Sequence, residues 1–127
     1  MIFDASSIYR AIEIDCLEQL TRAKTVDLAL YELGNVIRKE VVRKQISQDE
    51  GITLLEFVSR IISLMEILKI GLSNEVLKLA VESNLSYYDA SYLSASISLN
   101  EILVTEDEKL RGGAVKHGIR AQKLEEI

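Results

Sequence analysis

Proline is absent from this chain of 127 residues, and no internal repeat or low-complexity tract divides it. The single cysteine, Cys16, cannot form an internal disulfide, and no cysteine–histidine spacing typical of a metal site is present. No apolar run approaches the roughly 20 residues that a membrane span needs. The first residues also lack the basic segment and apolar stretch of a secretory signal. We therefore expect a single domain over residues 1–127, located in the cytoplasm and without contact to a membrane.

Positive charge is in the minority, because 15 Lys and Arg residues face 20 Asp and Glu residues and leave a net charge of -5. Simple nonspecific binding to nucleic acid depends on neutralising phosphates, so this surplus argues against it. A nuclease stays compatible, because basic residues gather locally in segments 38–44 and 109–123. The set from Arg38 to Lys44 is typical of a solvated helix face; it could instead steer RNA, and the sequence does not decide.

Short apolar segments alternate with amphipathic ones along the chain. We expect strands at residues 1–4, 102–104 and 119–124, a weaker one at 64–70, and a strand or a turn into a helix at 25–29. We expect a helix from about Ser7, with Ser6 and Ser7 as caps, and a short helix near 15–22. Two further helices are expected over 49–63 and from Ser73. Glu32 and Asp89 each lie in the first turn of another expected helix. A further short turn at 107–111 should be broken by Gly112 and Gly113. This alternation predicts an α/β fold, a three-layer α/β/α sandwich with a short central parallel sheet.

Four acidic residues should meet at one edge of that sheet. Asp4 and Asp107 lie at or just past the ends of strands, and Glu32 and Asp89 lie in the first turns of predicted helices. Strand C-termini and the N-termini of the following helices share an edge in an open parallel sheet. Gathering four carboxylates is unfavourable unless a divalent cation lies among them. Oxygen ligands of this kind suit Mg²⁺ or Mn²⁺, so the pattern predicts a metal site.

Each acid also has an ordinary structural explanation. Asp4 suits a strand-end cap, Glu32 a partner of the helix dipole, Asp89 a cap near Ser86, and Asp107 a turn. These separate explanations do not account for the expected position of all four acids at the same edge of the sheet. The aromatic residues nearby are interpreted as core and rim packing rather than as base-stacking platforms: Tyr87, Tyr88 and Tyr92.

Four motifs in order carry a family resemblance. They are Asp4-Ala5-Ser6 after an apolar strand, the segment Tyr31–Asn35, the segment Tyr88–Tyr92, and the segment Leu103–Leu110. Together they resemble the PIN-domain family, and within it the VapC-type ribonuclease toxins of toxin–antitoxin pairs. The resemblance extends over essentially the whole chain. It implies a sheet in the order 3-2-1-4-5, Mg²⁺-dependent endonucleolytic cleavage of RNA, a cognate antitoxin whose tail occupies the active-site groove, and a homodimer.

The resemblance also implies roles for single residues. Asp4, Glu32, Asp89 and Asp107 would be both the catalytic and the metal-binding acids, supported by Ser6, Asn35 and Thr105. A water would attack phosphorus in line while Asp89 or Asp107 orients or deprotonates it, which leaves 5′-phosphate and 3′-hydroxyl ends. Lys109 and Arg111 follow the last acid closely and are the candidates for contact with RNA phosphates.

Three other functions stay open at this point. A catalytically silent PIN-like binding module would have the same fold, but the presence of all four acids argues against it. A housekeeping RNA-processing PIN nuclease would share the chemistry and differ in biology; the compact chain favours the toxin. A phospho-receiver domain would need paired acids after the first strand, whereas Asp4 is followed by Ala5 and Ser6.

Overall fold

The computed structural model describes residues 1–127 and contains a five-stranded sheet in the order β3-β2-β1-β4-β5. All four neighbouring pairs of strands are parallel. The strands are β1 (Ile2–Phe3), β2 (Lys24–Val26), β3 (Glu66–Leu68), β4 (Leu103–Val104) and β5 (Ala121–Gln122). This topology confirms the predicted parallel α/β fold and the strand order implied by the resemblance.

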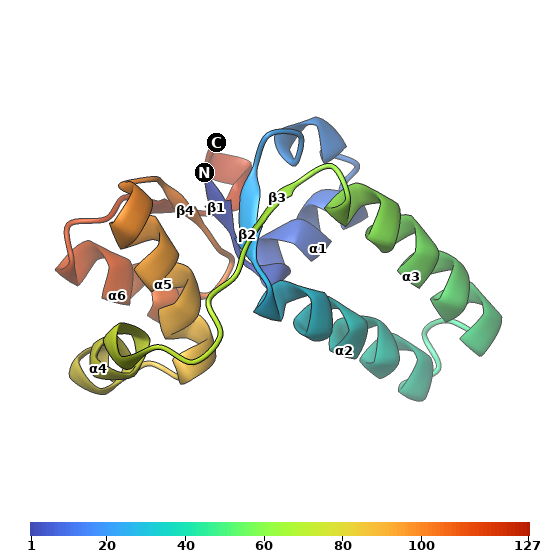
Figure 1. The fold of residues 1–127 in the computed structure, drawn as a ribbon. Helices are drawn as coiled ribbons and strands as arrows, with labels where there is room; N and C mark the ends of the chain where they lie inside the picture. Colours follow the sequence, from blue (N-terminus) through green and yellow to red (C-terminus); the bar gives the residue numbers. More distant parts are fainter.

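Helices cover both faces of the sheet (Figure 1). One side carries α1 (Ala5–Glu13), α2 (Leu28–Val42) and α3 (Gln48–Ile62), and the other carries α4 (Asn74–Ser83), α5 (Tyr87–Leu99) and α6 (Glu108–Lys116). Two 3₁₀ turns, Leu17–Gln19 and Leu124–Glu126, complete the chain. The path crosses to the second side between β3 and β4, so the sheet reverses its strand order between β1 and β4. None of these helices has the length and apolar character needed to cross a membrane.

The two central strands form the inaccessible middle of the core. Ile2, Phe3, Leu103 and Val104 are all fully buried, as expected for strands covered on both faces. Their register pairs Ile2 with Leu103 and Phe3 with Val104. The residues that follow these pairs therefore leave the sheet next to each other, at the point where the strand order reverses.

Side-chain caps set where most helices begin. Ser47 and Glu50 form a capping box at α3, and Ser73 and Ser86 cap α4 and α5 through the backbone N–H three residues on. The expectation that Ser6 and Ser7 cap the first helix is wrong. Asp4 accepts a hydrogen bond from the Ser7 N–H, so the helix begins at Ala5.

Two other boundaries differ from the sequence prediction. Residues 25–29 were expected to form either a strand or a turn into a helix, and they contain both. The strand β2 ends at Val26, and α2 begins at Leu28 after the cap Asp27. Glu32 consequently lies in the second turn of α2 rather than in its first. The short helix expected near residues 15–22 is only the single 3₁₀ turn Leu17–Gln19.

The prediction that Gly112 and Gly113 break the last helix is also wrong, because α6 runs continuously through both residues. The two glycines differ in their surroundings. A Cβ atom at Gly113 would lie 3.0 Å from Cδ1 of Leu85, whereas one at Gly112 would meet nothing within 4 Å. Gly113 thus permits close approach of α6 to Leu85, and Gly112 has no packing role.

This difference can be measured. We expect Gly112→Ala to raise the free energy of unfolding by about 0.5–1 kcal/mol, because alanine is favoured over glycine in a helix interior. Gly113→Ala serves as the matched variant and should gain less or lose stability, since its methyl group crowds Leu85. Urea unfolding of both proteins tests the comparison. A larger gain at Gly113 than at Gly112 would show that the close approach does not constrain α6.

Candidate active site

The four predicted acids lie at the carboxyl end of the sheet, where their charges act on one another. Asp4 follows β1 and caps α1, while Asp107 follows β4 and caps α6. Glu32 reaches the same edge from the second turn of α2, and Asp89 from the first turn of α5. The negative charges of Asp107, Asp4 and Glu32 all act on the carboxylate of Asp89. Residues separated by most of the chain length therefore share one region.

Asp4 is the most deeply buried of these acids, with 5% of its surface exposed. Its Oδ1 accepts hydrogen bonds from Ser6 Oγ at 2.7 Å and from the Ser7 N–H at 2.9 Å. Its Oδ2 accepts a hydrogen bond from the Thr105 hydroxyl. Burial raises the pKa of Asp4, and the hydrogen bonds from Thr105, Ser6 and Ser7 oppose that rise. The side chain is thus held in one orientation by both adjoining turns.

The hydroxyls of Ser6 and Thr105 also hold the turn between β4 and α6. Thr105 Oγ1 accepts a hydrogen bond from the Asp107 N–H at 3.0 Å, and Ser6 Oγ accepts one from the Glu106 N–H at 3.1 Å. The sequence singled out both residues as supports. It missed Ser7, whose buried hydroxyl donates to the Val104 carbonyl at 2.8 Å. A polar residue expected inside an apolar helix face is the signal that would have identified it.

Glu32 is held by a residue that sequence reasoning assigned only to packing. The hydroxyl of Tyr92 donates to Glu32 Oε1 at 2.5 Å, and Tyr92 is almost completely buried. Burial raises the pKa of Tyr92, and the hydrogen bond to Glu32 adds to the rise, so the phenol keeps its proton. Burial also raises the pKa of Glu32, against the lowering effect of Tyr92. Tyr92 lies one helical turn after Asp89, a spacing that indicates a shared face.

Asp89 differs from these two acids because its side chain makes no hydrogen bond; only its backbone N–H contacts a side chain, that of Ser86. Burial, and then the charges of Asp107, Asp4 and Glu32, raise the pKa of Asp89 to about 6. Lys109 acts in the opposite direction. The repulsion among the acids is therefore concentrated at Asp89, which has no donor to relieve it.

Asp107 is exposed, and its Oδ1 accepts a hydrogen bond from the Leu110 N–H at 2.9 Å. Asp107, interpreted from the sequence as a turn residue, is thus the cap of α6, and its second oxygen makes no hydrogen bond. The neighbouring Glu106 points elsewhere, because its Oε2 accepts a hydrogen bond from the Leu124 N–H at 3.0 Å. Of the two acids, Asp107 is thus the one whose charge reaches Asp89.

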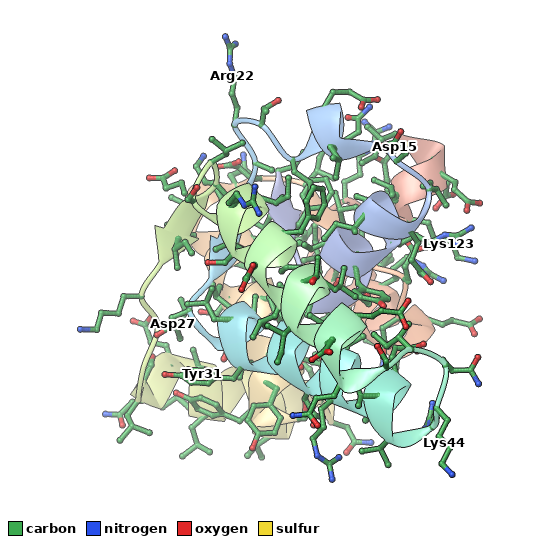
Figure 2. All side chains as sticks on the ribbon, turned by 90° about the vertical axis from the view of Figure 1, so that its right-hand side faces the viewer. Asp15, Arg22, Asp27, Tyr31, Lys44 and Lys123 are labelled. Carbon is green, nitrogen blue, oxygen red and sulfur yellow. The ribbon has the colours of Figure 1, made fainter.

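The other residues that the sequence suggested for the site, as supports or as RNA contacts, make fewer contacts with the acids. Asn35 is exposed on α2, three residues after Glu32, and its side chain makes no hydrogen bond. Lys109 is exposed beside Asp89, whereas Arg111 is partly buried and donates to the Thr105 carbonyl at 3.1 Å. Arg111 therefore braces the β4–α6 turn. The basic segment 38–44 occupies the far end of α2, and Figure 2 shows Lys44 well separated from Tyr31 at the near end.

The donor chemistry of this site fits a hard divalent cation, since the charges of three carboxylates act on a fourth, that of Asp89, and all of these donors are oxygens. The ligand sphere itself is not assembled. No group of three or more Asp, Glu, His or Cys side chains stands in position to hold one metal ion. The hydroxyls of Thr105, Ser6 and Tyr92 occupy oxygens of Asp4 and Glu32 instead.

The crowding at Asp89 has a consequence for stability without metal. A carboxyl whose pKa is higher in the folded than in the unfolded protein destabilises the fold progressively as pH rises through that range. We expect Asp89→Asn to stabilise the metal-free protein at pH 7 by on the order of 1 kcal/mol, reduced by solvent screening, and to have little effect near pH 4. Thermal unfolding in EDTA at both pH values measures this, with the exposed Glu82→Gln as control. Equal effects at both pH values would contradict charge repulsion as the cause.

Comparison with known proteins places this chain in a family. No protein-family model matches the chain. The chain is 30% identical over 111 residues to Exonuclease VapC9 from Pyrobaculum aerophilum, a match covering 86% of this chain and 81% of the relative. It is 31% identical over 98 residues to Ribonuclease VapC3 from the same organism, covering 74% and 72%.

A solved structure extends the likeness to three dimensions. The crystal structure of PAE2754 from Pyrobaculum aerophilum superimposes with a TM-score of 0.81 at 26% identity, over 98% of this chain and 89% of that chain. The fold, the order of the motifs and the sequence identity over most of both relatives agree with one another. The chain therefore belongs to the VapC family of PIN-domain proteins.

Proposed function

We propose that this VapC-family protein is a Mg²⁺- or Mn²⁺-dependent endoribonuclease that acts as the toxin of a toxin–antitoxin pair. The observation that carries the proposal is Asp89, a half-buried carboxylate without a hydrogen-bond donor among the charges of Asp107, Asp4 and Glu32. Such an arrangement is unfavourable on its own and becomes favourable once positive charge enters. The names of the two relatives, an exonuclease and a ribonuclease, support a nuclease.

The acids divide into two kinds, and this suggests a division of roles. Asp4 and Glu32 are oriented by the hydroxyls of Thr105, Ser6 and Tyr92, which suits ligands that must keep a fixed position. Asp89 is unrestrained and is our candidate for accepting the proton of the attacking water. Asp107 keeps one oxygen free beside it. All four acids would take part in holding the ion.

A divalent cation bound among these carboxylates would supply positive charge to a phosphate oxygen and make a bound water more acidic. The chain contributes the surrounding positions. Lys109, exposed and close enough to lower the pKa of Asp89, is the candidate for contact with an RNA phosphate. Arg111 is a weaker candidate because it already donates to the Thr105 carbonyl.

Endonucleolytic cleavage is supported by the openness of the acidic edge. Asp107 is exposed and Asp89 is half-buried. An internal phosphodiester can approach such an edge without threading of a free chain end. Because one relative is named an exonuclease, the test must distinguish the two modes.

The proposal includes two protein partners. A cognate antitoxin would limit the activity, as expected for the VapC family. A homodimer is supported by the outer face of α3, where Ile52, Leu55 and Phe57 are exposed while Val58 and Ile62 pack into the core. These exposed apolar side chains are typical of a surface that another chain covers.

A circular single-stranded RNA tests the activity directly, because an exonuclease cannot open it. We expect purified protein, free of antitoxin, to cleave the circle with Mg²⁺ or Mn²⁺ and to be inactive in EDTA. Asp89→Asn should lower the rate at least about a hundredfold by removing an acid from the reacting centre. Glu82→Gln, an exposed acid on α4, should leave the rate unchanged.

The outcomes separate the alternative functions. Cleavage of linear RNA alone would identify an exonuclease. Absence of any cleavage with either metal, in a folded protein, would favour the catalytically silent binding module. Cleavage at full rate by Asp89→Asn would remove the acidic site from the mechanism. A housekeeping role would be indicated if expression without antitoxin left growth unaffected despite activity on the purified RNA.

The positioning role of Thr105 can be tested without removing an acid. We expect Thr105→Val to lower the cleavage rate or the metal affinity by roughly tenfold or more, because Asp4 loses its buried donor. Thr105→Ser keeps the hydroxyl and should retain most of the activity. Metal titration of both variants, followed by cleavage rate, makes the comparison. Equal activities of the valine and serine variants would show that the hydroxyl does not position Asp4.

A further inference from the structure

A groove lies beside the acids at the same edge of the sheet, between the starts of α2 and α5 and the chain after β3. It has a volume of about 210 Å³ and its walls include Tyr31, Tyr88, Asp27 and Ile70. Tyr31 directly precedes Glu32 on α2, and Tyr88 directly precedes Asp89 on α5. The groove and the acids therefore belong to one edge of the sheet, and a polynucleotide bound at the acids can extend along this edge to the groove.

The two tyrosines are unusually accessible for aromatic residues. Tyr31 is 78% exposed and Tyr88 is 58% exposed, and neither hydroxyl makes a hydrogen bond. Tyr87, on the same groove, behaves differently: its hydroxyl donates to the Gly71 carbonyl at 2.6 Å and accepts from the Ser73 N–H at 2.9 Å. Tyr87 thus fixes the chain after β3, whereas Tyr31 and Tyr88 present free rings without a structural task.

The charge of the groove indicates which part of a nucleotide fits. Asp27 is the one charged residue of its lining, so a phosphate group would be repelled. Oδ1 of Asp27 accepts from the Leu28 and Ile70 N–H groups, at 3.1 Å and 3.3 Å, and Oδ2 accepts none. Carboxylate oxygens accept hydrogen bonds from base amino groups. Figure 2 shows Asp27 and Tyr31 close together at the start of α2.

From these observations we infer that Tyr31 and Tyr88 form a stacking site for an unpaired nucleobase next to the scissile phosphodiester. This inference rests on the proposed function and specifies its substrate, a single-stranded RNA segment whose base can be splayed out. Stacking on aromatic rings tolerates different bases, because each base offers a flat face. Asp27 favours bases that carry an amino group. This inference differs from the interpretation of Tyr88 as rim packing that the sequence favoured.

Binding of a short fluorescein-labelled single-stranded RNA with Mg²⁺ tests the stacking site, in the Asp89→Asn background to prevent cleavage. We expect Tyr31→Ala and Tyr88→Ala each to raise the Kd roughly five- to 100-fold, as loss of one stacked base does. Tyr31→Phe and Tyr88→Phe keep the rings and should bind normally. Val81→Ala, at an exposed apolar residue on α4 that does not line the groove, is the control and should change nothing.

A fully paired duplex of the same sequence provides the second measurement. Its bases cannot enter the groove, so its Kd should not respond to Tyr31→Ala or Tyr88→Ala. Equal losses for single strand and duplex, or a change below twofold for the single strand, would overturn the stacking site. A change of oligomeric state with RNA affinity intact would assign the groove to a second copy of the chain and would also overturn it.

Failure of the stacking site and failure of the proposed function give different results. If the wild-type protein cleaves circular RNA and the tyrosine variants bind it normally, the inference is wrong and the nuclease assignment stands. If no cleavage occurs but the alanine variants lose single-stranded RNA while the phenylalanine variants keep it, the stacking site stands without the nuclease.

Discussion

The contact between Asp4 and Thr105 joins the two central strands at the point where the sheet reverses its order. Residues next to each other in the β1–β4 register leave the sheet together, and the Thr105 hydroxyl donates to the buried carboxylate of Asp4. Ser6 and Ser7 supply the other donors. A buried carboxylate is tolerated only when such donors surround it. The starts of α1 and α6, and hence the positions of the acids they carry, depend on this one cluster.

Asp4 and Glu32 accept hydrogen bonds from neighbouring side chains, whereas the repulsion among the acids acts mainly on Asp89. The hydroxyl of Tyr92 stabilises Glu32, so both acids are paired with neutral donors rather than with positive charge. Neutral donors orient a carboxylate without cancelling its charge. Their fields, together with that of Asp107, act on Asp89, which has no donor of its own. These hydrogen bonds stabilise the fold, and the electrostatic repulsion at Asp89 destabilises it. Such unfavourable charge is expected at a site that binds a ligand.

Negative net charge and an RNA substrate are compatible because the relevant charges are distributed locally. The acids lie at one edge, and Lys109, whose charge acts on Asp89, lies on the first turn of α6. The basic segment 38–44 lies at the distant end of α2. RNA at the acidic edge would therefore depend on a metal ion, on Lys109 and on the aromatic groove rather than on a broad basic surface. This arrangement favours recognition of unpaired bases over affinity for any polyanion.

The alternation of apolar strands and amphipathic helices was sufficient to predict the parallel sheet, because burial on both faces demands apolar strands such as Ile2–Phe3 and Leu103–Val104. The order of Asp4, Glu32, Asp89 and Asp107 along the chain was equally readable, and strand ends and helix starts share an edge in any such sheet. Local boundaries were less certain. The last helix continues through Gly112 and Gly113, and Gly113 lies against Leu85, a residue of another segment that the local pattern does not include.

Single-sequence patterns cannot report contacts between segments distant along the chain. Tyr92 donates to Glu32 across 60 residues, and Thr105 donates to Asp4 across 101. The pairing of exposed Tyr31 with exposed Tyr88 on one groove arises in the same way, since α2 and α5 meet only in the folded chain. The kind of fold and the choice of the four acids as candidates could be read from local patterns, because periodicity and strand-end position are local properties. Which acids receive a hydrogen-bond donor and which one has none became visible only in the folded chain, because the donors are side chains from distant segments.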